Sequence, residues 1–285
     1  MKSFKIILLL IILVFILSSC AGNQSYLYNT GFLANSHWDM GKAEFQTYSG
    51  LITQYDEQRN ASFKFILVKE QFDENKFVKS NNGNLSVLKV NIIKTVPTGM
   101  YDYFQMGSLF FNVNTGEIIK FAISSQDGCG TTYIEYNSKS NKIIYNSYFD
   151  DQGEITRELS GSNFTFYDAL PVFLRFELGR KDSYELSLIP SLINNKFIEP
   201  EFQDALITNT IITNYKIGYE TYPEVYKSEV TYSDNTEAYY FQKDFPHTLI
   251  AWEKGNGDYL QLDNSLFIDY WNYTGNKDRH LILVK

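Results

Sequence analysis

Residues 108–123 read SLFFNVNTGEIIKFAI, with two apolar runs on either side of the polar triplet at residues 114–116. Phe, Val and Ile are enriched in β-strands, and glycine readily takes the positive φ that a tight turn between two strands requires. The stretch therefore predicts a β-hairpin whose turn contains Gly116.

Three other stretches repeat this order of strand, polar turn and strand: residues 131–148, 225–242 and 247–262. Aromatic residues make up 16% of the chain, with 22 Tyr and 22 Phe, which is typical of strands with one buried face. Successive hairpins favour an antiparallel meander. We expect a mainly β fold in which the meander forms a curved half-barrel or an open barrel.

Residues 167–176 (YDALPVFLRF) interrupt the strand pattern, because their apolar residues recur three and four positions apart. Asp168 stands where an N-cap is expected, and Pro171 stands in the first turn, where a missing N–H costs little. The pattern predicts one short helix that ends before Gly179. We expect the sheet to wrap around this helix.

The N-terminus reads MKSFKIILLLIILVFILSSC, a short basic head followed by an apolar run over residues 6–17. As a helix this run would reach about 18 Å, which is too short for a bilayer core of about 30 Å and is typical of a signal peptide. Its end, residues 17–20 (LSSC), resembles the lipobox of bacterial lipoproteins. The resemblance implies cleavage between Ser19 and Cys20 and lipidation of Cys20.

These observations divide the chain into a signal peptide over residues 1–19, a lipidated tether over 20–40 and a single β-rich domain over 41–285. A lipid on Cys20 would anchor the protein to a membrane of the bacterial cell envelope. Ala21 follows the cysteine where an Asp would favour retention at the inner membrane, so we expect the periplasmic face of the outer membrane. A plain secretory signal with an incidental cysteine is the alternative.

The chain carries 25 Lys and Arg against 33 Asp and Glu, a net charge of −8. Nucleic-acid binding draws most of its affinity from basic side chains, so DNA and RNA are excluded as partners. The three histidines, His37, His247 and His280, do not stand at metal-ligand spacing, and the common nucleotide-binding and hydrolase motifs are missing. We expect no metal, no cofactor and no enzymatic activity.

Cys129 would be the only thiol of the processed chain, and it stands between Gly128 and Gly130. One interpretation makes it a functional thiol, a nucleophile that a histidine activates. The other makes it a small buried residue in a tight connection between strands, and we favour this second interpretation.

Six short segments stand in the order found in a family of bacterial lipoproteins common in Bacteroidetes: residues 41–44, 87–89, 98–103, 126–130, 245–253 and 270–278. The chain resembles that family, which carries the label "septum formation inhibitor Maf". True Maf proteins are cytoplasmic nucleotide pyrophosphatases of α/β type, which neither the lipobox nor the hairpins fit. The resemblance therefore implies no activity and no catalytic residue.

Residues 167–176, together with the later strand at 239–246, also resemble lipoprotein carriers of the LolA/LolB type, whose curved sheet wraps a helix. We expect a lipid-anchored envelope protein that binds an apolar or amphiphilic molecule on its concave face. A structural or protein-interaction module of the outer membrane is the alternative, and an enzyme that depends on Cys129 is a third hypothesis.

Overall fold

The computed structural model describes residues 28–149, 151–161 and 163–282. The first half contains one 3-10 helix and nine strands: η1 (Ser36–Asp39), β1 (Ala43–Gln54), β2 (Glu57–Asp73), β3 (Val78–Lys79), β4 (Leu85–Pro97), β5 (Asp102–Asn112), β6 (Ile118–Gln126), β7 (Thr131–Asn137), β8 (Lys142–Ser147) and β9 (Gly153–Glu158).

The second half contains a central helical segment, further strands and two C-terminal 3-10 helices. These elements are β10 (Phe164–Phe166), η2 (Tyr167–Ala169), α2 (Leu170–Phe173), η3 (Leu174–Phe176), β11 (Ser183–Ile189), β12 (Gln203–Ile217), β13 (Glu220–Tyr232), β14 (Asn235–Gln242), β15 (Leu249–Lys254), β16 (Tyr259–Ile268), η4 (Tyr270–Asn272) and η5 (Asn276–Ile282).

The sixteen described strands form one sheet, which runs from β10 in sequence order to β16, then to β1, and on to β9, with β3 beside β2. Strands β1 and β16 pair antiparallel and so join the two halves of the chain. Among the described strands, only β10 and β11 pair in parallel. The strands at the two ends of the order, β9 and β10, do not pair, so the sheet stays open.

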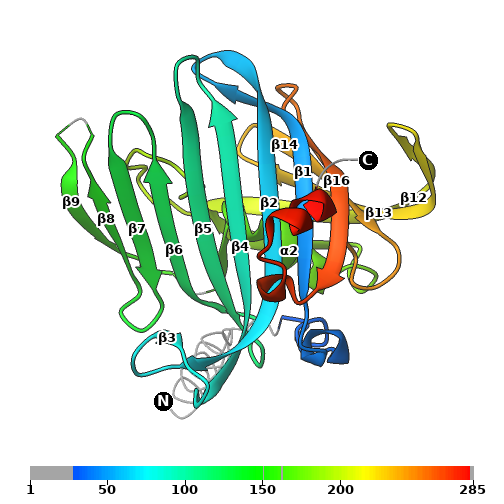
Figure 1. Cartoon of the computed structure of the whole chain (residues 1–285), viewed down its shortest axis with the longest axis horizontal. Coiled ribbons are helices and arrows are strands. Elements are labelled where there is room, and N and C mark those ends of the chain that lie inside the picture. The colour runs from blue at the N-terminus through cyan, green and yellow to red at the C-terminus, as the bar shows by residue number, and fades with distance from the viewer. Residues whose placement is uncertain (1–27, 150, 162, 283–285) are drawn as a thin grey trace, which may run out of the picture.

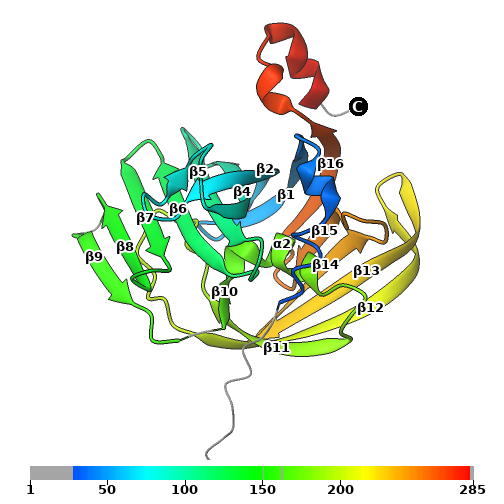
Figure 2. The same cartoon turned by 90° about the horizontal axis from the view of Figure 1, so that it is seen from below.

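The sheet bends into a crescent, and α2 lies on its concave side (Figure 2). The hairpin of β12 and β13 projects at one side, as Figure 1 shows. The prediction of a mainly β, antiparallel and curved sheet that surrounds one short helix is confirmed.

The hairpins that the sequence predicts are present. In the first, β5 pairs with β6, Asn112 N donates to Glu117 O at 2.8 Å, and Gly116 has a φ of 77°. The other three predicted hairpins are the pairs β7 with β8, β13 with β14, and β15 with β16. Local turn signals therefore determine much of the topology.

Residues 167–176 form η2, α2 and η3 in succession, which confirms the short helix. The N-cap assignment is wrong, because the chain enters η2 from Phe166, and no side chain caps that end. Asp168 lies within the first turn and its carboxylate points to another loop, where it accepts hydrogen bonds from Ser191 Oγ at 2.6 Å and Leu192 N at 2.7 Å.

A buried ion pair attaches this central helical segment to the sheet. Arg175 Nη2 lies 3.1 and 3.0 Å from the two carboxylate oxygens of Glu44 on β1, and both side chains are buried. Arg175 Nε also donates to Pro246 O at 2.8 Å, and its guanidinium lies 4.9 Å from the ring centre of Phe32. These contacts fix the helical segment against the middle of the concave face.

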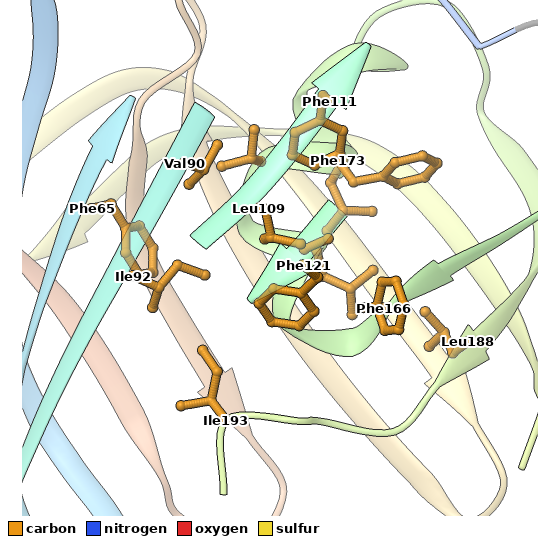
Figure 3. Packing of buried hydrophobic residues seen from close by; sticks show 14 of the residues in the cluster. Phe65, Val90, Ile92, Leu109, Phe111, Phe121, Phe166, Phe173, Leu188 and Ile193 are labelled. Carbon is orange, nitrogen blue, oxygen red and sulfur yellow. The ribbon is translucent and has the colours of Figure 1, made fainter. Parts of the chain in front are cut away.

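Apolar side chains from the sheet and the helical segment pack into one large core between them (Figure 3). Phe121 on β6 is fully buried, and its ring centre lies 5.3 Å from that of Phe166. A Cβ at Gly107 would lie 2.9 Å from both Phe121 and Ile193, so the packing there leaves no room for a side chain. This part of the interior is close-packed.

Residues 28–40, the described part of the segment expected to be a tether, pack against the body. Phe32, Leu33 and Trp38 are buried members of the large core. Trp38 Nε1 donates to Phe32 O at 2.8 Å. The packed domain therefore includes residues that precede position 41.

Phe121→Ala tests this core. The change should lower the free energy of unfolding by about 3–5 kcal/mol, because it removes a fully buried ring from a close-packed site. Ile144 is exposed on β8, and Ile144→Ala should change stability by only about 0.5 kcal/mol. Urea unfolding measures both values, and similar losses in the two variants would contradict the assigned core.

Candidate functional site

A cavity of about 200 Å³ lies between the concave face and the central helical segment. Strands on both sides of the β1–β16 junction and the first turns of the helical segment surround it. Its apolar wall consists of Ile52, Phe63, Phe65, Ile92, Pro171, Ile193, Leu249 and Leu260, with Tyr167, Tyr239 and Trp252 beside them. Four charged residues also line it, namely Lys94, Asp168, Lys254 and Asp258.

Among the described residues, Lys94 is the charged group of the cavity that has no hydrogen-bond or ion-pair partner. It lies on β4 between Ile92 and Val96, in the alternation that turns these side chains to the concave face. In the part of the chain that the structure describes, no carboxylate lies within ion-pair distance of Lys94 Nζ. Burial in apolar surroundings lowers the pKa of Lys94, and the charges of Asp168 and Asp258 oppose this shift.

The two aspartates are held in place by donors of the protein. Burial raises the pKa of Asp168, while its bonds to Ser191 and to the backbone of residues 192 and 193 favour the charged form. Asp258 accepts from Thr53 N at 2.8 Å and from Thr53 Oγ1 at 2.6 Å, which ties the turn before β16 to the end of β1. Both carboxylates therefore stabilise the walls of the cavity.

Lys254 differs from Lys94 because it is already paired. Its Nζ lies 3.1 Å from Glu237 Oε1, and Glu237 is almost fully buried. Glu237 also accepts hydrogen bonds from several neutral donors: Tyr167 Oη at 2.8 and 2.9 Å, Tyr239 Oη at 3.0 Å, Trp252 Nε1 at 2.8 Å and Tyr232 Oη.

The cluster of residues around Glu237 fixes one wall of the cavity. Burial and the negative charge of Glu237 raise the pKa of Tyr167 and Tyr239, so both hydroxyls stay protonated and donate to the carboxylate. Because Tyr167, Tyr239 and Trp252 are each held by this one carboxylate, their rings present fixed apolar surfaces to the cavity.

Cys129 is not among the residues that line the cavity. It lies in the turn between β6 and β7. It is exposed, so the interpretation as a buried packing residue is wrong. Asp127 Oδ1 accepts from Cys129 N at 2.8 Å and from Gly130 N at 3.0 Å, and Cys129 Sγ lies 3.6 Å from Tyr101 Oη. None of these contacts involves a histidine, and the functional role of the thiol stays a hypothesis.

The histidines lie in other surroundings. His37 stacks on Phe267, His247 Nδ1 lies 3.2 Å from Gln242 O, and His280 contacts Lys277 O. Among the described residues, no group of three or more His, Cys, Asp or Glu side chains is arranged to hold a metal ion. Ser19 and Cys20 lie outside the described residues. Within those residues, no helix has the length and apolar character needed to cross a bilayer.

No family model, curated protein or solved structure matches this chain. The two resemblances drawn from the sequence therefore stay predictions.

Lys94 and Glu237 are the residues of the site that the sequence interpretation missed. Both carried a signal, since each is a charged residue at an inward position of an alternating strand. Lys94 follows Val90 and Ile92 at every second position, and Glu237 precedes Tyr239 and Phe241 in the same way. A charge at such a position indicates either a buried pair or a site.

Lys94→Met should stabilise the empty protein by about 1 kcal/mol, because methionine fills similar space without a poorly solvated ammonium. The pKa of Lys94 is lower in the folded than in the unfolded chain, so wild-type stability rises as the pH approaches the ordinary lysine value of 10.5. The advantage of the variant should therefore shrink over that range.

Urea unfolding at neutral pH and at about pH 10 measures this effect. Lys64→Met is the matched control, since Lys64 lies on the opposite face of the neighbouring strand β2. A Lys94→Met protein that is less stable than wild type at neutral pH would show that the ammonium has a partner in the folded state.

Proposed function

We propose that this protein is a non-enzymatic binding protein that holds an apolar or amphiphilic molecule in the cavity beneath the central helical segment. The cavity itself carries the proposal. It measures about 200 Å³, and most of its wall is apolar. Filling such a space with hydrocarbon recovers the dispersion contacts that an empty cavity lacks.

The rigidity of the walls supports a binding role. The Glu237 cluster, the Asp168 bonds to the loop at residues 191–192 and the Asp258 bonds to Thr53 each fix a different side. A site with a preformed apolar lining and a few placed polar groups is typical of small-molecule binding proteins. Little ordering is then needed when a ligand enters.

The predicted lipid anchor would give this site a source of ligands. We propose that lipidation at Cys20 holds the domain at the surface of an envelope membrane. Amphiphilic molecules are concentrated at such a surface. The LolA/LolB-like arrangement expected from the sequence agrees with such a role. The protein-interaction module stays an alternative prediction.

Native mass spectrometry of the delipidated domain tests the proposal. The protein is mixed with equal concentrations of decanoate, decanol, decylamine and a lysophospholipid, and one-to-one adducts are measured. Wild type should retain at least one of these amphiphiles. Ile52→Phe should weaken all adducts about tenfold or more, because the larger side chain occupies the cavity.

Ile144→Phe is the control, since this change adds the same atoms on the exposed side of β8. It should bind as wild type does. The absence of every adduct from wild type, or equal adducts in wild type and Ile52→Phe, would contradict the proposed function.

A further inference from the structure

We propose that the ligand of the cavity is an amphiphile with a carboxylate head group, and that Lys94 binds this head group. The inference rests on the proposed function, because it names the chemical class of the molecule that the cavity holds.

Two lysines, Lys94 and Lys254, line the cavity. Lys254 Nζ lies 3.1 Å from a carboxylate oxygen of Glu237, so its charge is compensated within the protein. Lys94 has no ion-pair partner among the described residues, although its side chain lines the same cavity. The ammonium of Lys94 is therefore able to donate hydrogen bonds to a ligand in the cavity.

Two carboxylates, those of Asp168 and Asp258, line the cavity together with Lys94. The charges of Asp168 and Asp258 favour the protonated form of Lys94. Neither carboxylate forms an ion pair with Lys94 Nζ in the part of the chain that the structure describes. Asp168 is engaged by Ser191 and Leu192, and Asp258 by Thr53. These hydrogen bonds fix the two carboxylates in the walls of the cavity and stabilise their negative charge. When a ligand displaces water from the cavity, an acceptor for the Lys94 ammonium must therefore come from the ligand.

Possible occupants of the cavity differ in the acceptor that they offer to Lys94. Water solvates the ammonium in an empty cavity, and a hydrocarbon that displaces this water leaves the charge without an acceptor, at a high cost in free energy. A carboxylate offers a charged acceptor and a short, strong hydrogen bond. A hydroxyl offers a neutral acceptor, and an amine adds a like charge. The expected order of affinity is therefore carboxylate, then alcohol, then amine.

The apolar part of the ligand would lie along the other walls. Ile92 and Phe65 are direct neighbours across β4 and β2, and Leu249, Trp252 and Leu260 face them from β15 and β16. A hydrocarbon chain of medium length suits this lining, because every one of these side chains offers an apolar surface. The head group at Lys94 would fix the orientation of the chain.

Competition between decanoate, decanol and decylamine tests the inference by isothermal titration calorimetry and native mass spectrometry. Wild type should prefer decanoate over decanol by about tenfold, the difference expected for one charge-assisted hydrogen bond. Lys94→Met should lose this preference and bind decanol at least as well as decanoate. Lys94→Arg keeps the positive charge and should retain a preference for decanoate.

Lys64→Met is the matched control, because it removes a lysine from the opposite face of the adjacent strand and leaves the cavity unchanged. It should keep the wild-type order. Circular dichroism and thermal melting establish that each variant is folded before titration.

Each other outcome overturns the inference in a distinguishable way. Equal binding of decanoate and decanol by wild type would remove the role of Lys94 and leave the proposed function standing. A preference for decylamine would make Asp168 and Asp258 the contacts of the head group instead. If none of the three compounds binds to wild type, and the lysophospholipid does not bind either, the proposed function fails together with the inference.

Discussion

The buried ion pair between Arg175 and Glu44 is the contact on which the rest of the structure depends. A curved open sheet has a large apolar concave face, and the central helical segment packs on that face. Arg175 attaches the segment to β1 through Glu44 and to the turn before β15 through Pro246 O. Loss of either partner would leave a buried charge uncompensated, which is strongly destabilising in proteins.

The same attachment creates the cavity. With Arg175 fixed, the other end of the segment places Tyr167, Asp168 and Pro171 above the strands, and the space beneath them is the cavity. Two of these residues are then fixed a second time, Tyr167 by Glu237 and Asp168 by the loop at residues 191–192. Among the described residues that line the cavity, Asp168, Asp258 and Lys254 have partners in the protein, and Lys94 has no hydrogen-bond or ion-pair partner.

The sequence predicts the strands and hairpins well because their signals are local. Alternating apolar residues and a glycine such as Gly116 define a hairpin without reference to the rest of the chain. The short helix is predicted for the same reason. The N-cap role of Asp168 fails because its carboxylate has better donors in a loop more than twenty residues away.

The cavity depends on contacts between distant segments, and a single sequence does not contain them. Phe32 and Trp38 fall within the segment predicted to be a tether, although both are buried in the core, and Phe32 lies against Arg175. Glu237 and Lys94 are both charged residues on inward positions, and the sequence does not tell which of them finds a partner. β4, β14, β15 and the helical segment all line one cavity, and the pairing of Glu237 with Lys254 becomes visible only in that arrangement. Among the described residues, Lys94 has no such ion pair.

A crystal structure of the delipidated protein with decanoate would test the central claim most directly. We expect electron density for the acyl chain between β4 and β15, with a carboxylate oxygen at hydrogen-bonding distance from Lys94 Nζ. A cavity closed by the surrounding side chains, or decanoate found only on the outer surface, would contradict it.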